Sequence, residues 1–154
     1  MRLNTTVQLI VFRLDERRYA LPLEMVDRVA RAAEVTPLPK APAIVLGAIN
    51  VRGRVLPVLN VRRRFAMPER EIRPEDWFLL AHTDRRELAL VIDHSDGVIE
   101  CSADDINVST HIVPGLEPFP GVMKLDDGLA LIHDLEKFLS LDETHALEDA
   151  MNEN

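Results

Sequence analysis

The sequence predicts an all-β fold, and three features of the chain indicate it. Aliphatic and β-branched residues gather in short runs bounded by turn signals such as Gly, Pro and Asp. Helical spacing of apolar residues is confined to short stretches, so no long helix is expected. The apolar pattern of the first half also recurs in the second half, which is typical of an internal duplication. We therefore expect two small β-barrels that pack against each other.

Six runs are predicted as strands because they combine β-branched and aliphatic residues over a short length. They span residues 7–14, 55–61, 78–81, 88–92, 121–125 and 129–132. Residues 21–35 are ambiguous, because their apolar residues have helical spacing while Pro22 can open either a helix or an edge strand. We expect a short turn followed by a strand there.

The best helical segment covers residues 135–141. Asp134 is placed to cap its N-terminus, and Leu135, Phe138 and Leu139 form one apolar side. Residues 142–154 are acidic and lack a clear apolar stripe, so we expect them to form an exposed or frayed tail.

Two alignments without gaps relate the halves of the chain. Residues 9–31 lie over residues 78–100 with six identities in 23 positions, and residues 47–65 lie over residues 121–139, where the apolar positions correspond. Each half therefore consists of a hairpin, a proline-rich link and a second hairpin.

The predicted organisation is a single domain over residues 1–141. Residues 7–14 together with 78–141 contribute to one barrel subdomain, and residues 15–77 contribute to the other. Several strands are apolar on both faces, and a barrel of about 65 residues has only a narrow interior. Packing of one barrel on the other would cover part of the outer apolar surface, and partner proteins could cover the rest.

The charge of the chain is unevenly distributed. The net charge is −8, but residues 1–77 carry 14 Lys and Arg against 9 Asp and Glu, whereas residues 78–154 carry 4 against 17. A net acidic chain with 5% aromatic residues is a poor nucleic-acid binder, so we expect protein partners and no nucleic acid. The single cysteine agrees with a reducing compartment, and no apolar run suits a membrane span or a signal peptide. We expect a cytoplasmic protein without direct membrane insertion.

The segment from Gly47 to Phe65 is the most informative part of the chain. Two apolar runs flank an Arg52-Gly53-Arg54 turn, and three further arginines, residues 62–64, follow the second run. Gly53 supplies a turn conformation that other residues resist. Arginines without a neighbouring base, nucleophile or metal ligand indicate binding rather than catalysis. Pro57 cannot donate a ladder hydrogen bond and so favours an edge strand or a bulge.

An enzymatic alternative rests on scattered histidines. A metal-dependent hydrolase could use His82, His94 and His133, with nearby aspartates as further ligands. No HExxH, CxxC or GxSxG motif and no phosphate-binding glycine loop occurs in the chain. We therefore expect no enzymatic activity, no catalytic residue, no metal and no cofactor, and we keep the hydrolase as the alternative.

The order of these segments resembles the CheW family, whose members couple chemoreceptors to the histidine kinase CheA. The resemblance covers residues 7–141 and is carried by YALPLEMVDRVAR, ELALVIDHSDGVIE and GLALIHDLEKFLS. Its most specific part is the pattern PAIVLGxINVRGRxxPVxNVR. The resemblance implies two small SH3-like five-stranded barrels and a non-enzymatic adaptor.

The resemblance also implies partners and a site. One barrel would bind the regulatory domain of a CheA-type histidine kinase, and the groove between the barrels would hold the tip of a chemoreceptor's cytoplasmic hairpin. Asn50, Arg52 and Gly53 match the family's Asn-x-Arg-Gly element, although Asn50 and Gly53 could serve turn formation alone. The candidate partner-binding residues, which also include the flanking arginines and the adjacent strand, are Asn50, Arg52, Gly53, Arg54, Val55, Pro57, Val58 and Arg62.

Two positions depart from the family pattern. Arg28 stands where an acidic residue is usual, and Ser95 stands where a branched apolar residue is usual. These departures leave open whether the partner kinase serves flagellar chemotaxis or a parallel pathway such as pilus motility.

Overall fold

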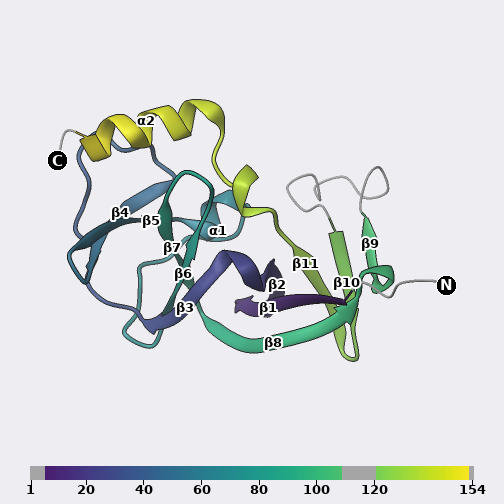
Figure 1. Cartoon of the computed structure of the whole chain (residues 1–154). Coiled ribbons are helices and arrows are strands. Elements are labelled where there is room, and N and C mark those ends of the chain that lie inside the picture. The colour runs from purple at the N-terminus through teal and green to yellow at the C-terminus, as the bar shows by residue number, and fades with distance from the viewer. Residues whose placement is uncertain (1–5, 109–120, 153–154) are drawn as a thin grey trace.

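A computed structural model describes residues 6–108 and 121–152 of the chain and contains two β-sheets, each rolled into a small barrel (Figure 1). The first barrel has six strands, and its sheet order is β8-β1-β2-β11-β10-β9. All neighbouring strands in it are antiparallel except β2 and β11. In chain order its strands are β1 (Thr6–Leu14), β2 (Arg17–Pro22), β8 (His94–Ser102), β9 (Ile106–Val108), β10 (Gly121–Leu125) and β11 (Gly128–Ile132).

The second barrel has five strands in the order β3-β6-β7-β5-β4, again with one parallel pair, β5 and β7. A bridge from Thr36 to Ala48 extends this sheet beyond β4. Its strands are β3 (Val26–Arg31), β4 (Val45–Val51), β5 (Arg54–Leu59), β6 (Trp77–His82) and β7 (Glu87–Ile92).

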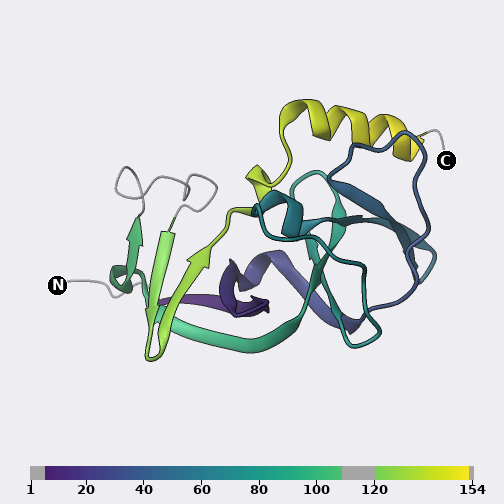
Figure 2. The same ribbon diagram turned by 180° about the vertical axis from the view of Figure 1, so that it is seen from behind.

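The two barrels exchange strands. By the repeat, β1, β2 and β3 correspond to β6, β7 and β8, yet β3 pairs with β6 and β8 pairs with β1. Each barrel therefore combines two strands of one half with the remaining strands of the other half. The sequence predicted one barrel from residues 15–77 and the other from residues 7–14 with 78–141. In the structure β2 instead pairs with β1, and β6 and β7 instead belong to the barrel of β3–β5. Figure 2 shows from behind how β8 runs from the five-stranded barrel along the six-stranded one.

Strands that are apolar on both faces serve two cores. Leu9 and Val11 point into a core of the six-stranded barrel, whereas Ile10 and Phe12 belong to a larger core that the two barrels share. In β7, Leu88 and Leu90 join the shared core while Ala89 joins a core of the five-stranded barrel. The expectation that each barrel would cover outer apolar residues of the other is confirmed.

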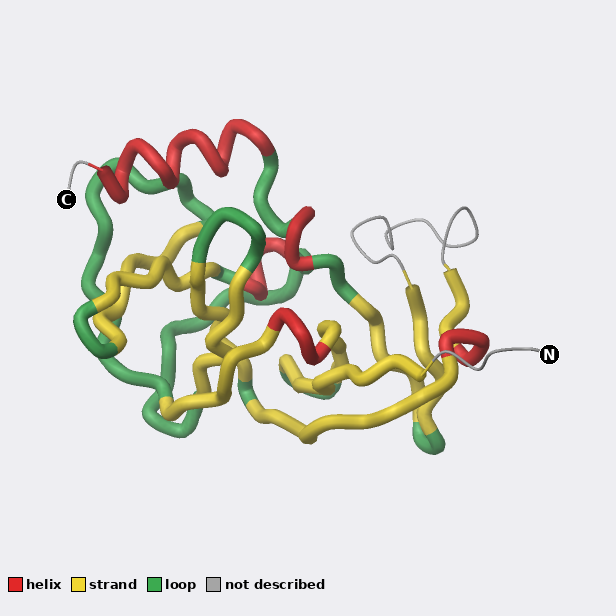
Figure 3. The backbone as a smooth tube through the Cα atoms, in the orientation of Figure 1, coloured by secondary structure: helices red, strands yellow, loops and turns green. Residues whose placement is uncertain are grey.

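The helical part of the chain is small (Figure 3). A 3-10 turn at Leu135–Lys137 stands where a longer helix was predicted, and Asp134 caps it by accepting a hydrogen bond from the backbone N–H of Glu136. Asn60 caps α1 (Val61–Arg64) in the corresponding place of the first repeat. The remaining 3-10 turns are Leu23–Met25 and Ala103–Asp105.

The prediction of an exposed acidic tail is wrong for the described residues. They form α2 (Leu141–Asn152), which lies across the five-stranded barrel (Figure 1). Leu147 and Ala150 are each 1% exposed, and Arg64 pairs with Glu143 while Arg85 pairs with Glu148. Two buried residues on a mainly polar helix were too weak a periodic signal to detect.

The strand predictions hold with shifts of one or two residues at their ends. Residues 21–35 contain a short turn and then β3, as expected. Pro57 was predicted on an edge strand or at a bulge. The edge strand is wrong, because β5 lies between β4 and β7, whereas an irregularity is present nearby, where the register of β4 with β5 shifts between Val45 and Gly47. Ala48, which pairs with Pro57 on β4, uses its backbone N–H and C=O for hydrogen bonds to Thr36. The pairing of β5 with β7 begins only at Val58, so neither neighbouring strand requires an N–H from Pro57.

Candidate protein-binding site

The β4–β5 hairpin ends in a two-residue turn made by Arg52 and Gly53. Their φ angles are +52° and +85°, which is the type I′ arrangement that matches the twist of paired strands. Asn50 Oδ1 accepts a hydrogen bond of 2.8 Å from the backbone N–H of Gly53. Asn50 and Gly53 therefore build the turn, and the turn holds Arg52 in a left-handed conformation that is strained for a residue with a side chain.

The predicted site residues separate into exposed and buried groups. Asn50, Arg52, Gly53 and Arg54 are exposed, and Val55 is 54% exposed. Three others face the interior, namely Pro57, Val58 and Arg62. The buried side chains support the hairpin but are not available to a partner.

Arg62 belongs to an ion-pair network at the junction of the barrels. Its guanidinium binds Asp15 in the β1–β2 turn at 2.8 Å and Asp93 between β7 and β8 at 2.9 Å. Arg70 continues the network from Asp93, at 2.6 Å, to the buried Asp76, at 2.7 Å. The hydrogen bonds from Arg62 lower the pKa of Asp15. Arg62 therefore has a structural role, because its ion pairs connect α1 with the β1–β2 turn and with the junction of β7 and β8.

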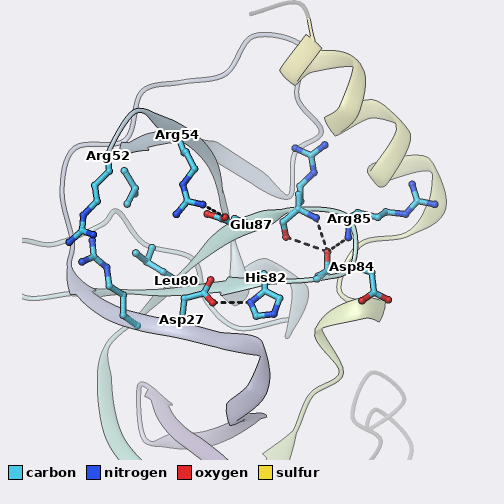
Figure 4. Close-up of a pocket in the computed structure, with 12 residues that line it drawn as sticks. Asp27, Arg52, Arg54, Leu80, His82, Asp84, Arg85 and Glu87 are labelled. Atoms are coloured by element: carbon cyan, nitrogen blue, oxygen red, sulfur yellow. Dashed lines mark hydrogen bonds and ion pairs between the residues drawn. The ribbon is translucent and has the colours of Figure 1, made fainter.

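A groove of about 680 Å³ opens between the tip of the β4–β5 hairpin and the β6–β7 turn (Figure 4). Figure 4 shows Arg52 and Arg54 on one side, Asp27 and His82 on the other, and Leu80 between them. The full lining comes from β3 to β7 and the intervening turns: Asp27, Arg28, Val51, Arg52, Arg54, Leu80, His82, Thr83, Asp84, Arg85, Arg86 and Glu87.

Arginines dominate the groove. Arg54 pairs with Glu87 across it, and Asp27 pairs with His82 Nδ1 at 2.9 Å. Within the described part of the chain, Arg28, Arg52 and Arg86 make no side-chain hydrogen bond or ion pair. The groove therefore presents uncompensated positive charge on a chain whose net charge is −8.

The three histidines of the hydrolase alternative are not brought together. His82 lies in the groove, the side chain of His94 is 63% exposed beside Asp96 on β8, and His133 is buried among Phe65 and Phe138. In residues 6–108 and 121–152 no group of three or more His, Cys, Asp or Glu side chains is arranged to hold a metal ion. In the same residues no helix is long and apolar enough to cross a membrane.

Comparison with known proteins decides the family. The family model described as "CheW-like domain" matches residues 8–143, which is most of the chain. The chain belongs to the CheW-like family. The chain is 27% identical over 146 residues to the chemotaxis protein CheW of Treponema pallidum, covering 91% of this chain and 86% of that protein. It is 34% identical over 95 residues to protein FrzA of Myxococcus xanthus, covering 62% and 59% of the two chains.

A solved CheW structure has the same fold. The crystal structure of the scaffolding protein TtCheW from Thermoanaerobacter tengcongensis matches with a TM-score of 0.81 and 23% identity, over 90% of this chain and 96% of that one. The prediction of an all-β, CheW-like fold with two SH3-like barrels is confirmed, but the prediction of five strands in each is wrong for the barrel of β1, which has six.

Sequence reasoning missed one side of the groove. Arg28 was noted only as a departure from the CheW pattern, and Arg85 and Arg86 were not among the predicted site residues. The repeat could have indicated the turn, because residues 84–86 correspond to 15–17 at a hairpin end. No periodic signal brings β3, the β4–β5 tip and the β6–β7 turn to one place, because the strand exchange creates that proximity.

Proposed function

We propose that this chain is a non-enzymatic adaptor that couples chemoreceptors to a CheA-type histidine kinase, in chemotaxis or a related motility pathway. Membership of the CheW-like family carries the proposal. The exposed Arg52 on its rigid turn supports it, because a charged side chain held in a strained conformation beside an open groove suits recognition.

The adaptor would act through binding alone. A protein that holds a receptor and a kinase at two surfaces raises their effective concentration and fixes their relative geometry. Any influence of the receptor on the kinase is then a coupling free energy between two binding sites, carried by the interlocked barrels. The chain would reach membrane-bound receptor arrays from the cytoplasm through these protein partners.

The surface proposed for a partner is the exposed part of the β4–β5 hairpin. It comprises Asn50, Arg52, Gly53, Arg54 and Val55, while Pro57, Val58 and Arg62 are left out because they are buried. The hydrolase alternative is set aside, because its histidines are dispersed and the family match gives it no support.

Reconstitution tests the proposal. The purified chain is mixed with the regulatory domain of the kinase encoded nearest to it and with the cytoplasmic hairpin of a receptor from the same genome. Calorimetry is expected to show binding to each, and size-exclusion chromatography is expected to show a complex of all three. Absence of binding to both proteins would refute the adaptor function.

A further inference from the structure

We propose that the groove at the end of the five-stranded barrel binds an acidic protein segment in which an apolar residue stands beside carboxylates, and that Arg28 and Arg52 bind those carboxylates. The inference rests on the adaptor function proposed above and specifies the chemistry of the partner segment. Three independent features of the groove support it.

The first feature is uncompensated charge. Five of the twelve lining residues are arginines and three are Asp or Glu. Arg54 is matched by Glu87, Asp27 faces His82, and Arg85 is matched by Glu148 of α2. In the described residues this leaves the guanidinium groups of Arg28, Arg52 and Arg86 without a partner, against a single unpaired carboxylate in the groove, that of Asp84. Guanidinium groups bind carboxylates through two parallel hydrogen bonds, so they suit an acidic side chain.

The second feature is an apolar hollow directly beside these arginines. A smaller hollow of about 290 Å³ shares Arg28, Val51, Arg52 and Leu80 with the groove. Of its seven other lining residues four are apolar, namely Ala30, Ala33, Ile49 and Phe78, and three are polar or charged, namely Arg31, Glu34 and Asn50. Arg28 and Arg52 therefore stand at the border between a charged groove and an apolar hollow. A segment that fits both would place an apolar side chain in the hollow and a carboxylate next to it.

The third feature is the preorganisation of the binding groups. Arg52 is fixed at the tip of a type I′ turn by the Asn50–Gly53 hydrogen bond. Arg28 follows an irregularity in β3, where the register with β6 shifts between Val26 and Arg28. Arg28 lies within the paired strand β3 and Arg52 lies in a hydrogen-bonded turn, so little backbone order has to be gained on binding.

The groove favours an acidic protein segment over a nucleic acid. The chain as a whole carries −8 and would repel an extended polyanion outside the groove. Among the described residues that line the groove none is Phe, Tyr or Trp, on which a base could stack. A short acidic segment with one apolar side chain satisfies the local charge and the hollow together.

Short labelled peptides test the chemistry directly. Fluorescence anisotropy with the full chain would compare Glu-Glu-Leu-Glu-Glu with versions in which Gln replaces Glu or Gly replaces Leu. We expect the acidic peptide with Leu to bind about tenfold or more tightly than either variant, and its affinity to fall as salt rises. Arg28→Glu and Arg52→Glu are each expected to weaken its binding by about tenfold or more.

Lys124→Glu is the matched control, because it makes the same charge reversal at an exposed position of β10 in the other barrel. It is expected to leave peptide binding unchanged. Arg28 is exposed, and circular dichroism with thermal melting would verify that each variant is folded. The inference is wrong if the acidic peptide binds no better than the Gln version, if Arg28→Glu and Arg52→Glu behave like Lys124→Glu, or if an oligonucleotide of equal charge binds more tightly.

Binding of the kinase domain and the receptor hairpin separates this inference from the adaptor function. If wild-type chain binds these proteins and Arg28→Glu binds them equally well, the adaptor function stands and the acidic segment is excluded as the contact. If wild-type chain binds neither protein, the adaptor function fails, and the peptide experiment alone decides what the groove recognises.

Discussion

Arg62 and Asp15 form a two-point ion pair that joins the two barrels. Nη1 lies 3.1 Å from Oδ2 and Nη2 lies 2.8 Å from Oδ1 of Asp15. Arg62 is on α1, directly after β5 of one barrel, and Asp15 is in the β1–β2 turn of the other. Asp93, at the point where the chain passes from β7 to β8, accepts from the same guanidinium. The pair therefore stabilises the relative position of the barrels together with the apolar core between them.

We expect Arg62→Met to lower the free energy of unfolding by about 3 kcal/mol, because it removes charged hydrogen bonds at a site that is 8% exposed. Arg63→Met is the matched control. The side chain of Arg63 is 50% exposed and lies 3.6 Å from Glu69, so its loss should cost less than about 0.5 kcal/mol. Urea denaturation of both variants measures the difference. If both variants lost the same free energy of unfolding, the ion pairs of Arg62 would contribute no more to stability than the exposed pair of Arg63.

Acid should destabilise the protein in part through Asp76, which is 2% exposed. Burial alone would raise the pKa of this carboxyl, but hydrogen bonds from Arg70 and from the backbone N–H of Arg73 outweigh burial and lower the pKa below its ordinary value of 3.8. The stabilisation is therefore complete above that value and is lost as the pH falls through the lowered pKa of the folded state.

The Asp76→Asn variant tests this dependence. Urea denaturation between about pH 6 and pH 3 should show a smaller loss of stability on acidification for the variant than for wild type. Parallel pH profiles for the two proteins would show that Asp76 has the same pKa folded and unfolded.

The sequence predicted the local elements better than their assembly. Apolar runs and turn residues located most strands, and Asp134 was correctly assigned as a cap, because these features depend on neighbouring residues. The exchange of β3 and β8 between the barrels depends on contacts between distant segments, which no local pattern records. The candidate site shows the same limit. The hairpin tip was predicted, but the burial of Arg62 and the meeting of Arg28 with Arg52 follow from the tertiary structure alone.

Gly47 and Gly53 both have positive φ angles but differ in their surroundings. A Cβ on Gly47 would lie 2.3 Å from the carbonyl oxygen of Thr36, which accepts a hydrogen bond from Ala48 N, whereas a Cβ on Gly53 would meet nothing within 4 Å. We expect Gly47→Ala to cost about 3 kcal/mol through this backbone clash, and Gly53→Ala to cost about 1 kcal/mol through its φ of +85° alone. Thermal melting of the two variants would compare them, and similar melting temperatures would argue against the clash.

Packing of α2 should contribute to stability although the helix was not predicted. Leu147 is 1% exposed in the shared core, whereas Leu141 at the start of the same helix is 65% exposed. Leu147→Ala is expected to cost about 3 kcal/mol, and Leu141→Ala less than about 0.5 kcal/mol. Urea denaturation measures both values. A negligible effect of Leu147→Ala would mean that α2 does not stay docked in solution.

Arg52 should be dispensable for folding and required for binding. Its φ of +52° is more favourable for Asn or Asp than for Arg, so Arg52→Asn and Arg52→Asp should melt at or above the wild-type temperature. Loss of the positive charge should weaken binding of the kinase regulatory domain or the receptor hairpin, and the reversed charge of Arg52→Asp should weaken it further. Calorimetry with each partner measures the effect, with Lys124→Asp on β10 as the control for charge elsewhere. Equal affinity of wild type and Arg52→Asp for both proteins would remove Arg52 from the proposed surface.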